Sequence, residues 1–312
     1  MAGVTVAVVL VPQALAYAYL AGVPPVYGLY ASLLPMLIYG LMGTSPHMNV
    51  GPVAITAVLI LAGISSLAEP FTQDYVDLVV LCGLIVGLLQ LIMGLLRMGF
   101  IVNFLSHPVL SGFISAAAVI IIVSQLPNLL GIQIGDSDST VDKLWSIFQN
   151  IYGCHRLTIL IGGISLLVLI AIKKIAPRFP GLLFVITATT VLSFYIDAPS
   201  QNVSVIGSIP SGLPKFDVSF LSINKIGSIM PTALTICFVG FIGSLSISKG
   251  LELKHRSYKV SANRELLALG VSKIVGSFFQ AMPSSGSFSR CALNDTSGAY
   301  SCLLYTSDAA DE

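Results

Sequence analysis

Apolar residues recur along almost the whole chain in long runs that are separated by short polar stretches. A helix needs about 20 apolar residues to cross the hydrocarbon core of a bilayer, and repeated runs of this kind are typical of transmembrane helices. The pattern predicts ten apolar segments, at residues 4–21, 28–43, 51–66, 76–96, 101–130, 157–173, 180–196, 228–248, 264–281 and 288–301. We therefore expect an all-α polytopic membrane protein, with the lipid bilayer as its solvent.

The third and tenth segments are shorter than a full span, and both open at breaks rich in Gly, Pro and Ser. Gly51 and Pro52 open the third segment, and Ser287 precedes the tenth. Short segments of this kind are the expected signature of discontinuous half-helices at the binding site of a transporter. Because they lie seven positions apart in the order of segments, we expect a seven-plus-seven inverted-repeat transporter fold. This chain would hold the first ten spans, with the third and tenth as half-helices.

Composition narrows the class of protein further. Hydrophobic residues make up 55% of the chain and charged residues 9%, with a mean hydropathy of +0.91. These values exclude a soluble core, and no basic tract suits nucleic acid. The cysteines show no paired spacing, so we expect no metal site, no disulfide framework and no cofactor. Gly83, Gly87 and Gly94 follow one another along the fourth segment, where we expect them to permit close helix packing.

Basic residues concentrate on one side of the predicted spans. If the first segment runs outward, Arg97, the basic residues of 173–178 and those of 249–264 fall on the same side. That side is cytoplasmic by the positive-inside rule.

The polar break at residues 286–290 carries the side chain with the clearest chemical meaning, the guanidinium of Arg290. An arginine at bilayer depth costs about 2.5–3.5 kcal/mol on insertion scales, so it normally faces a partner or a watery cavity. A helix that begins at such a break adds unsatisfied N–H groups and the positive end of its dipole. The sequence therefore predicts an anion site. The alternative is that Arg290 only anchors the tenth helix to carbonyl oxygens or to Asp295.

Two other classes of protein compete with this interpretation. An intramembrane serine hydrolase would need a nucleophile and a base, and Ser287 or Ser289 with His47 is the only pairing that the sequence suggests. No G-x-S-x-G elbow is present. A nucleobase permease of the same architecture would place acidic residues in the site, where this chain has Arg290.

Several motifs, in order along the chain, resemble the SulP family of sulfate permeases and animal solute-carrier anion exchangers, which includes prestin. They lie at residues 11–18, 22–30, 43–45, 51–54 and 263–270. The resemblance covers residues 2 to about 301 and implies fourteen spans, a core and a gate domain, a homodimer and a cytoplasmic STAS domain. We assign 1–301 to a partial transmembrane domain, with the STAS domain absent from this fragment. Residues 302–312 read as translated sequencing-adapter sequence.

The resemblance also implies which residues hold the anion. Matching positions are Gln13 and Tyr17 on the first helix, Val53 at the start of the third, and Ser289 with Arg290 at the start of the tenth. Amide, hydroxyl and guanidinium groups can all donate hydrogen bonds to an anion, whereas Val53 would offer an apolar wall.

One departure from the family pattern bears on coupling. Many bacterial and plant members carry a glutamate on the eighth helix, where this chain has Gly243. Apart from Asp295, we expect no acidic residue within a span that could relay protons. We therefore expect a secondary active exchanger of anions such as sulfate, chloride, bicarbonate or oxalate, in the plasma membrane. An anion channel or a voltage-dependent motor of the same family is the alternative.

Overall fold

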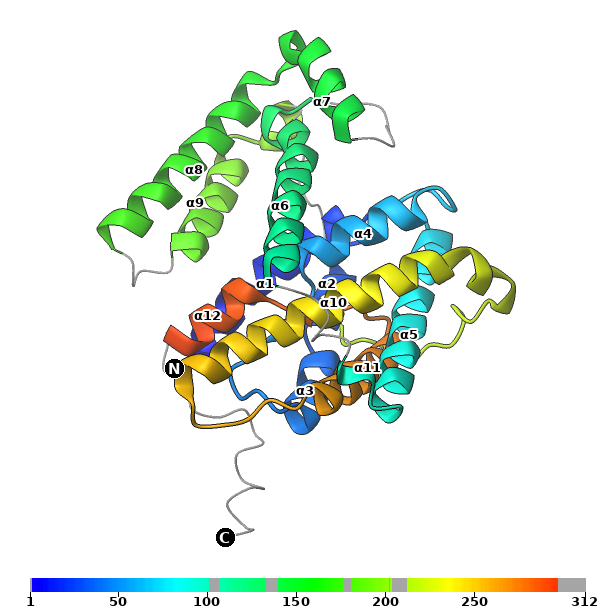
Figure 1. Ribbon diagram of the computed structural model, residues 1–312. Helices are drawn as coiled ribbons and strands as arrows, with labels where there is room; N and C mark the ends of the chain where they lie inside the picture. Colours follow the sequence, from blue (N-terminus) through cyan, green and yellow to red (C-terminus); the bar gives the residue numbers. More distant parts are fainter. Residues whose placement is uncertain are drawn as a thin grey trace. The chain divides into compact units, whose positions relative to one another are not determined.

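The computed structural model describes residues 2–100, 107–132, 140–176, 181–201, 203 and 212–296. The chain divides into two compact units (Figure 1). Unit 1 combines Met1–Leu105 with Ile209–Glu312, and unit 2 is Ser106–Ser208. Two segments far apart in the sequence therefore build unit 1 together.

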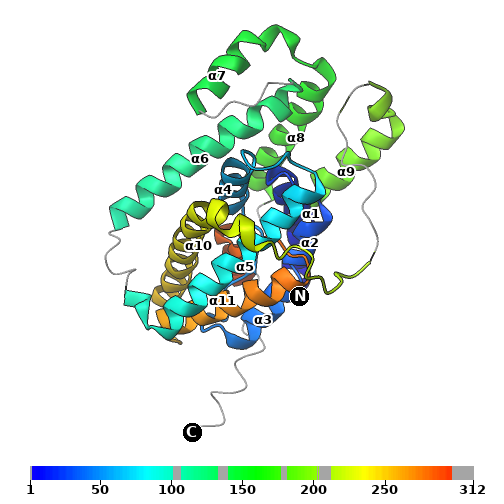
Figure 2. The ribbon, with the colours of Figure 1, turned by 90° about the vertical axis from the view of Figure 1, so that its right-hand side faces the viewer.

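Unit 1 contains eight α-helices in its described residues and one short antiparallel strand pair. Its elements are α1 (Ala2–Leu20), α2 (Val26–Ala31), α3 (Leu34–Met42), β1 (Val50–Gly51), α4 (Ala54–Ile64), α5 (Gln73–Leu95), α10 (Ile226–His255), α11 (Ala262–Phe278), β2 (Ser285–Gly286) and α12 (Phe288–Thr296). Helices α5, α10 and α11 pack against one another, and α3 packs on α11 (Figure 2). The hydrophobic core of the chain lies among them.

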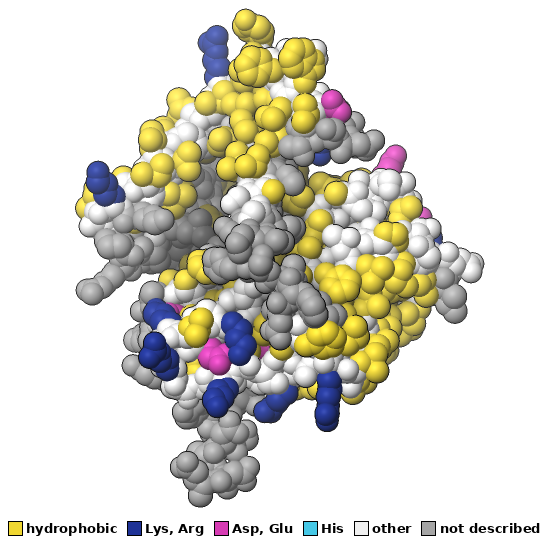
Figure 3. All heavy atoms as spheres, in the orientation of Figure 1, with side chains coloured by type: hydrophobic (Ala, Val, Ile, Leu, Met, Phe, Trp, Pro, Cys, Tyr) yellow, Lys and Arg dark blue, Asp and Glu magenta, His cyan; other side chains and the backbone are white. Residues whose placement is uncertain are grey.

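Unit 2 contains α6 (His107–Leu130), α7 (Thr140–Gln149), α8 (Arg156–Ile175) and α9 (Gly181–Tyr195). The side chains of α8 that are exposed are largely apolar, including Leu160, Ile164 and Leu167. Hydrophobic side chains cover much of the visible surface of this unit in Figure 3. Apolar side chains facing outward are expected where the surroundings are lipid.

Each of the ten predicted segments contains a helix, although residues 101–106 and 297–301 of those segments lie outside the described residues. Among the described residues, α5 and α10 are long and apolar enough to cross a membrane by length and composition alone. The basic residues expected on one side include those around the C-terminal end of α10, where Lys and Arg gather in Figure 3.

Three details differ from the predicted pattern. The second segment is broken into α2 and α3 because Pro35 lies in the first turn of α3, where its missing N–H costs nothing, and cannot continue α2. Helix α7 was not predicted, since its amphipathic sequence is too polar for a span. Within the part of the chain that the structure describes, the fold is all-α except for the strands β1 and β2, whose two residues each are too short to leave a pattern.

Glycines allow α5 and α11 to pack closely, as the sequence predicted. A Cβ atom at Gly87 would lie 2.9 Å from the carbonyl oxygen of Gly270, and one at Gly270 would lie 2.7 Å from the backbone nitrogen of Leu91. Both obstacles are backbone atoms, which cannot rotate away. In a bilayer, where hydrophobic burial does not drive helix association, this contact is a principal source of cohesion.

Polar groups add a second tie in the same region. The buried Lys273 ammonium donates to Gln90 Oε1 at 2.9 Å, and Gln90 Nε2 donates to the carbonyl oxygen of Cys237 at 3.2 Å. This chain of hydrogen bonds joins α11, α5 and α10. Lys273 therefore has the structural role that such a residue takes when it is satisfied inside a helix bundle.

Substitution of Gly270 by alanine is expected to destabilise unit 1. The added methyl group forces α5 and α11 apart, at a cost of about 1–3 kcal/mol, the range for overpacking. Thermal unfolding of the detergent-purified protein measures the effect. Gly250→Ala, at an exposed position near the end of α10, is the matched control, because a Cβ atom there meets nothing within 4 Å. An equal melting temperature for Gly270→Ala and the control contradicts the close packing.

Candidate functional site

The starts of α4 and α12 are brought together by the strand pair. Val50 pairs with Gly286 and Gly51 with Ser285, in antiparallel register. Each strand leads within three residues into its half-helix. Both helix N-termini therefore lie beside the same short ladder, as the inverted-repeat pattern predicted for the third and tenth segments.

Further hydrogen bonds fasten the chain before β1 to α12. The Ser287 backbone N–H donates to the carbonyl oxygen of Asn49 at 3.1 Å, and the Asn294 side chain donates to that of His47 at 3.2 Å. The Asn49 backbone N–H lies 3.1 Å from Cys291 Sγ. These contacts fix the position of α12 against the loop between α3 and β1.

The first backbone N–H groups of both half-helices have no hydrogen-bond partner within their own helix. The N-cap of α4 is Val53, in extended conformation, and it makes no side-chain cap. In α12 the first intrahelical donor at this end is the Cys291 N–H, which bonds to the Ser287 carbonyl at 2.9 Å. The earlier N–H groups of each helix have no intrahelical partner, so two positive dipole ends remain at the ladder.

Arg290 lies in the first turn of α12 with no exposed surface. Its Nε donates to Asn49 Oδ1 at 2.8 Å, and its Nη1 donates to Gln13 Oε1 at 3.3 Å. Its Nη2 is buried without a hydrogen-bond partner. Both acceptors are neutral amides, and no ion pair of Arg290 occurs among the described residues. The guanidinium is therefore a buried charge with one unused donor, an arrangement that favours an anionic ligand.

Gly51 gives this guanidinium its space. A Cβ atom at Gly51 would lie 3.1 Å from Arg290 Nη2, closer than most such contacts. The free Nη2 group thus lies directly against the β1 backbone, at the approach to α4. Two hydroxyls at the strand pair are also buried without partners, Oγ of Ser285 in β2 and Oγ of Ser284 directly before it. Unpaired buried polar groups are costly, so a concentration of them indicates that a polar ligand or water occupies the region.

The other predicted site residues lie around Arg290 to different degrees. Gln13 contacts it directly, and Tyr17 lies one helical turn further along α1, where its side chain is half-buried. Ser289 is exposed and lies 3.3 Å from Ser287, hydroxyl to hydroxyl. Val53 is half-buried at the start of α4. Helix α1 packs against both α4 and α12, which explains how residues from three segments converge.

Gly243 lies next to this region, on α10. The hydroxyl of its neighbour Ser244 accepts the Gly286 backbone N–H at 2.9 Å, which ties α10 to β2. A Cβ atom at Gly243 would meet nothing within 4 Å. The space beside Gly243 could therefore hold a larger side chain than glycine has.

The acidic residues differ from the sequence expectation. Asp295 forms ion pairs with Lys254 and His255 at the end of α10, so it does not anchor Arg290. Glu265, which the sequence interpretation overlooked, is fully buried at the start of α11. It accepts hydrogen bonds from Tyr39 Oη at 2.8 Å and from the Thr44 N–H at 2.8 Å. Its place in the first turn of a helix, with Asn263 and Arg264 before it, is the signal that could have drawn attention to it.

Asn49 is the site residue that the sequence interpretation missed. It holds Arg290 through its side chain and Ser287 through its carbonyl oxygen. A polar residue two positions before the Gly51 and Pro52 break is a signal for such a role, but its partner lies 241 positions away in the chain. Sequence spacing alone does not reveal that contact.

Comparison with known proteins places this geometry in a family. The sulfate permease family matches residues 1–305. The chain is 38% identical to sulfate transporter 4.1, chloroplastic, of Arabidopsis thaliana over 305 residues, which cover 96% of this chain and 44% of that protein. It is 33% identical to solute carrier family 26 member 6 of Homo sapiens, covering 96% of this chain and 42% of that protein. The chain thus spans less than half the length of these curated relatives.

Solved structures agree with the predicted fold. The structure of SLC26A9 matches with a TM-score of 0.89 and 25% identity, covering 96% of this chain and 50% of that one. The transmembrane domain of a cyanobacterium bicarbonate transporter, BicA, matches with a TM-score of 0.82 at 23% identity, over 97% of this chain and 77% of that one. The seven-plus-seven inverted-repeat fold predicted from the half-helices is confirmed. The chain belongs to the sulfate permease family and is part of a multi-pass membrane protein.

Proposed function

We propose that the protein to which this chain belongs is a secondary active anion transporter, with the anion held between the N-termini of α4 and α12. The observation that carries the proposal is the buried guanidinium of Arg290, whose Nη2 has no partner beside two helix starts. The guanidinium charge and the two helix N-termini are positive, and the unused Nη2 group can donate a hydrogen bond. They attract an anion and repel a cation.

Each residue has a distinct part in binding. Arg290 supplies the charge and a free N–H group, while Asn49 holds its Nε side in place. The backbone N–H groups at the starts of α4 and α12 and the exposed Ser289 hydroxyl replace water around the anion. Gln13 orients Nη1 through its amide oxygen, so its amide N–H₂ remains available as a donor. Val53 offers only an apolar wall.

The binding residues all belong to one unit. Gln13, Tyr17 and Val53 from the first part of the chain and Ser289 and Arg290 from the last part lie in unit 1. A site built within one compact unit can move without being dismantled. We propose alternating access by movement of unit 1, as the core domain, against unit 2, as the gate domain. The homodimer and the plasma-membrane location stay predictions.

Substrate choice follows from the chemistry of the donors. Backbone amides, hydroxyls and one guanidinium discriminate between anions through size and the cost of dehydration, not through a unique hydrogen-bond pattern. Sulfate, chloride, bicarbonate and oxalate are the candidate substrates. The family consists of transporters, which argues against the serine hydrolase considered above.

Coupling is expected to be anion exchange. Gly243 leaves the position on α10 without an acidic side chain, and Asp295 is engaged by Lys254 and His255. Neither position therefore offers a free carboxylate that could carry a proton at the site. A channel or a voltage-dependent motor would use the same pocket, so transport measurements must separate these from an exchanger.

Anion flux in proteoliposomes tests the proposal. We expect uptake of labelled sulfate that is driven by an opposing chloride gradient. Large chloride current under voltage clamp without sulfate uptake would identify a channel. Absence of flux for sulfate, chloride, bicarbonate and oxalate alike would contradict a transport function.

Replacement of Arg290 by glutamine is expected to weaken anion binding by about tenfold or more, since a charged hydrogen bond contributes roughly 1.5–3 kcal/mol. Equilibrium binding of labelled sulfate or chloride to the purified protein measures this. Arg264→Gln, at an exposed arginine of α11, is the matched control and should bind as the parent does. If Arg290→Gln retains anion affinity but loses thermal stability, the arginine is structural.

Replacement of Gly243 by glutamate is expected to make anion uptake sensitive to a proton gradient. The open space at this position accepts the side chain, and a carboxylate on α10, next to the residue that contacts β2, can bind and release a proton. Uptake at several external pH values measures the effect. Gly243→Gln has the same shape without the titratable group, so identical pH responses of the two variants would refute the coupling role.

A further inference from the structure

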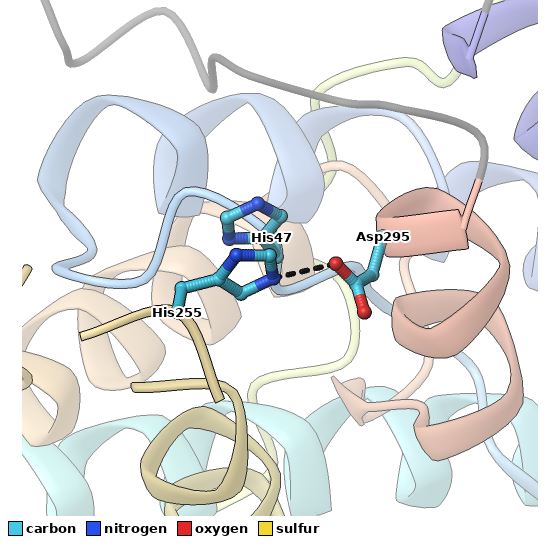
Figure 4. A group of neighbouring side chains, drawn as sticks. All are labelled: His47, His255 and Asp295. Carbon is cyan, nitrogen blue, oxygen red and sulfur yellow. Dashed lines mark hydrogen bonds and ion pairs between the residues drawn. The ribbon is translucent and has the colours of Figure 1, made fainter. Parts of the chain in front are cut away.

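Two histidines and an aspartate converge at the end of α10. His47 lies in the loop between α3 and β1, His255 is the last residue of α10, and Asp295 lies near the end of α12. One ligand atom of each lies within 4.8 Å of the other two. Figure 4 shows the two imidazoles one above the other, with the carboxylate facing the ring of His255. No sequence pattern indicates this cluster, because its members are far apart along the chain.

The contacts within the cluster hold the rings in a defined arrangement. His255 Nε2 lies 2.6 Å from Asp295 Oδ1, and the two imidazole rings stack with centroids 4.4 Å apart and planes inclined by 5°. Tyr258 stacks on His47 at 5.6 Å. The side chain of Asp295 is 6% exposed and that of His255 31% exposed. The cluster is therefore ordered and sheltered, yet reachable from the surface.

The second oxygen of Asp295 is also engaged. Lys254 donates to Oδ2, which leaves Oδ1 as the oxygen that faces the histidines. A carboxylate that binds a metal through one oxygen is commonly held through the other by a neighbouring donor. Lys254 is positioned to fill that supporting role.

We propose that His47, His255 and Asp295 bind a divalent transition-metal ion of the zinc type. Two imidazole nitrogens and one carboxylate oxygen are ligands that Zn²⁺ prefers, with a fourth position left for water. Bond lengths of about 2.0–2.2 Å place tetrahedral ligands roughly 3.3–3.6 Å apart. His255 Nε2 and Asp295 Oδ1, which are 2.6 Å apart, therefore need to separate to admit the ion, while the His47 ring moves closer to them. Tilting of the stacked rings provides this movement. The metal ion takes the place of the direct contact between His255 Nε2 and Asp295 Oδ1.

Such an ion would join three segments of unit 1. It would connect the loop that enters β1, the C-terminal end of α10 and the end of α12 in one coordination sphere. Ligands that bind the folded state alone stabilise it by mass action. The predicted consequence is a more stable unit 1, and it can be measured without any transport assay. Failure of the transport proposal would leave it untouched.

Binding of Zn²⁺ to the purified protein tests this site. We expect Zn²⁺ to raise the melting temperature by several degrees and a chelator to reverse the rise. Co²⁺ should produce the visible absorption of a tetrahedral nitrogen and oxygen site. His47→Ala, His255→Gln and Asp295→Asn should each reduce the Zn²⁺-induced rise by more than half.

Two control variants separate ligation from general effects. Lys254→Gln removes an ion pair of Asp295 but no ligand, so it should retain most of the response to Zn²⁺. His155→Ala, at a histidine of unit 2 that bonds to Thr158, should retain all of it. Melting temperatures without metal identify any variant that is itself unstable. No response of the parent protein to Zn²⁺ and Co²⁺, or equal responses of the ligand and control variants, would overturn the proposal.

Discussion

An uncompensated positive charge inside unit 1 is the constraint on which the rest of the structure depends. Arg290 is fully buried, its two acceptors are neutral amides, and no ion pair satisfies it among the described residues. A buried charge normally requires a partner of opposite sign, because the loss of hydration costs several kcal/mol. Here the neighbouring helix starts add positive potential instead. A bound anion supplies the partner of opposite charge that Arg290 lacks.

Holding such a charge requires a rigid surrounding, and the fold supplies it through several independent ties. The two-residue strand pair aligns the half-helices, Asn49 joins the loop before β1 to α12, and Ser244 joins α10 to β2. Behind them, close packing of α5 on α11 through Gly87 and Gly270 gives unit 1 a stable base. A preorganised site of this kind does not have to order itself when the anion arrives, so less binding free energy is lost.

The sequence predicted the features that arise from local chemistry. Gly51 and Pro52 marked the start of one half-helix, and the cost of an intramembrane arginine singled out Arg290. Contacts between distant segments were not predictable in the same way. The strand register, the bond from Arg290 to Asn49 and the burial of Glu265 depend on which segments fold together. The His47, His255 and Asp295 cluster has the same origin.

Anomalous diffraction from crystals containing selenate or bromide can show where the anion binds in unit 1. These ions replace sulfate and chloride and can be located without ambiguity. We expect a peak about 3–4 Å from Arg290 Nη2, between the starts of α4 and α12. No peak there, with bound ions only along the basic loops near the end of α10, would contradict this position of the anion.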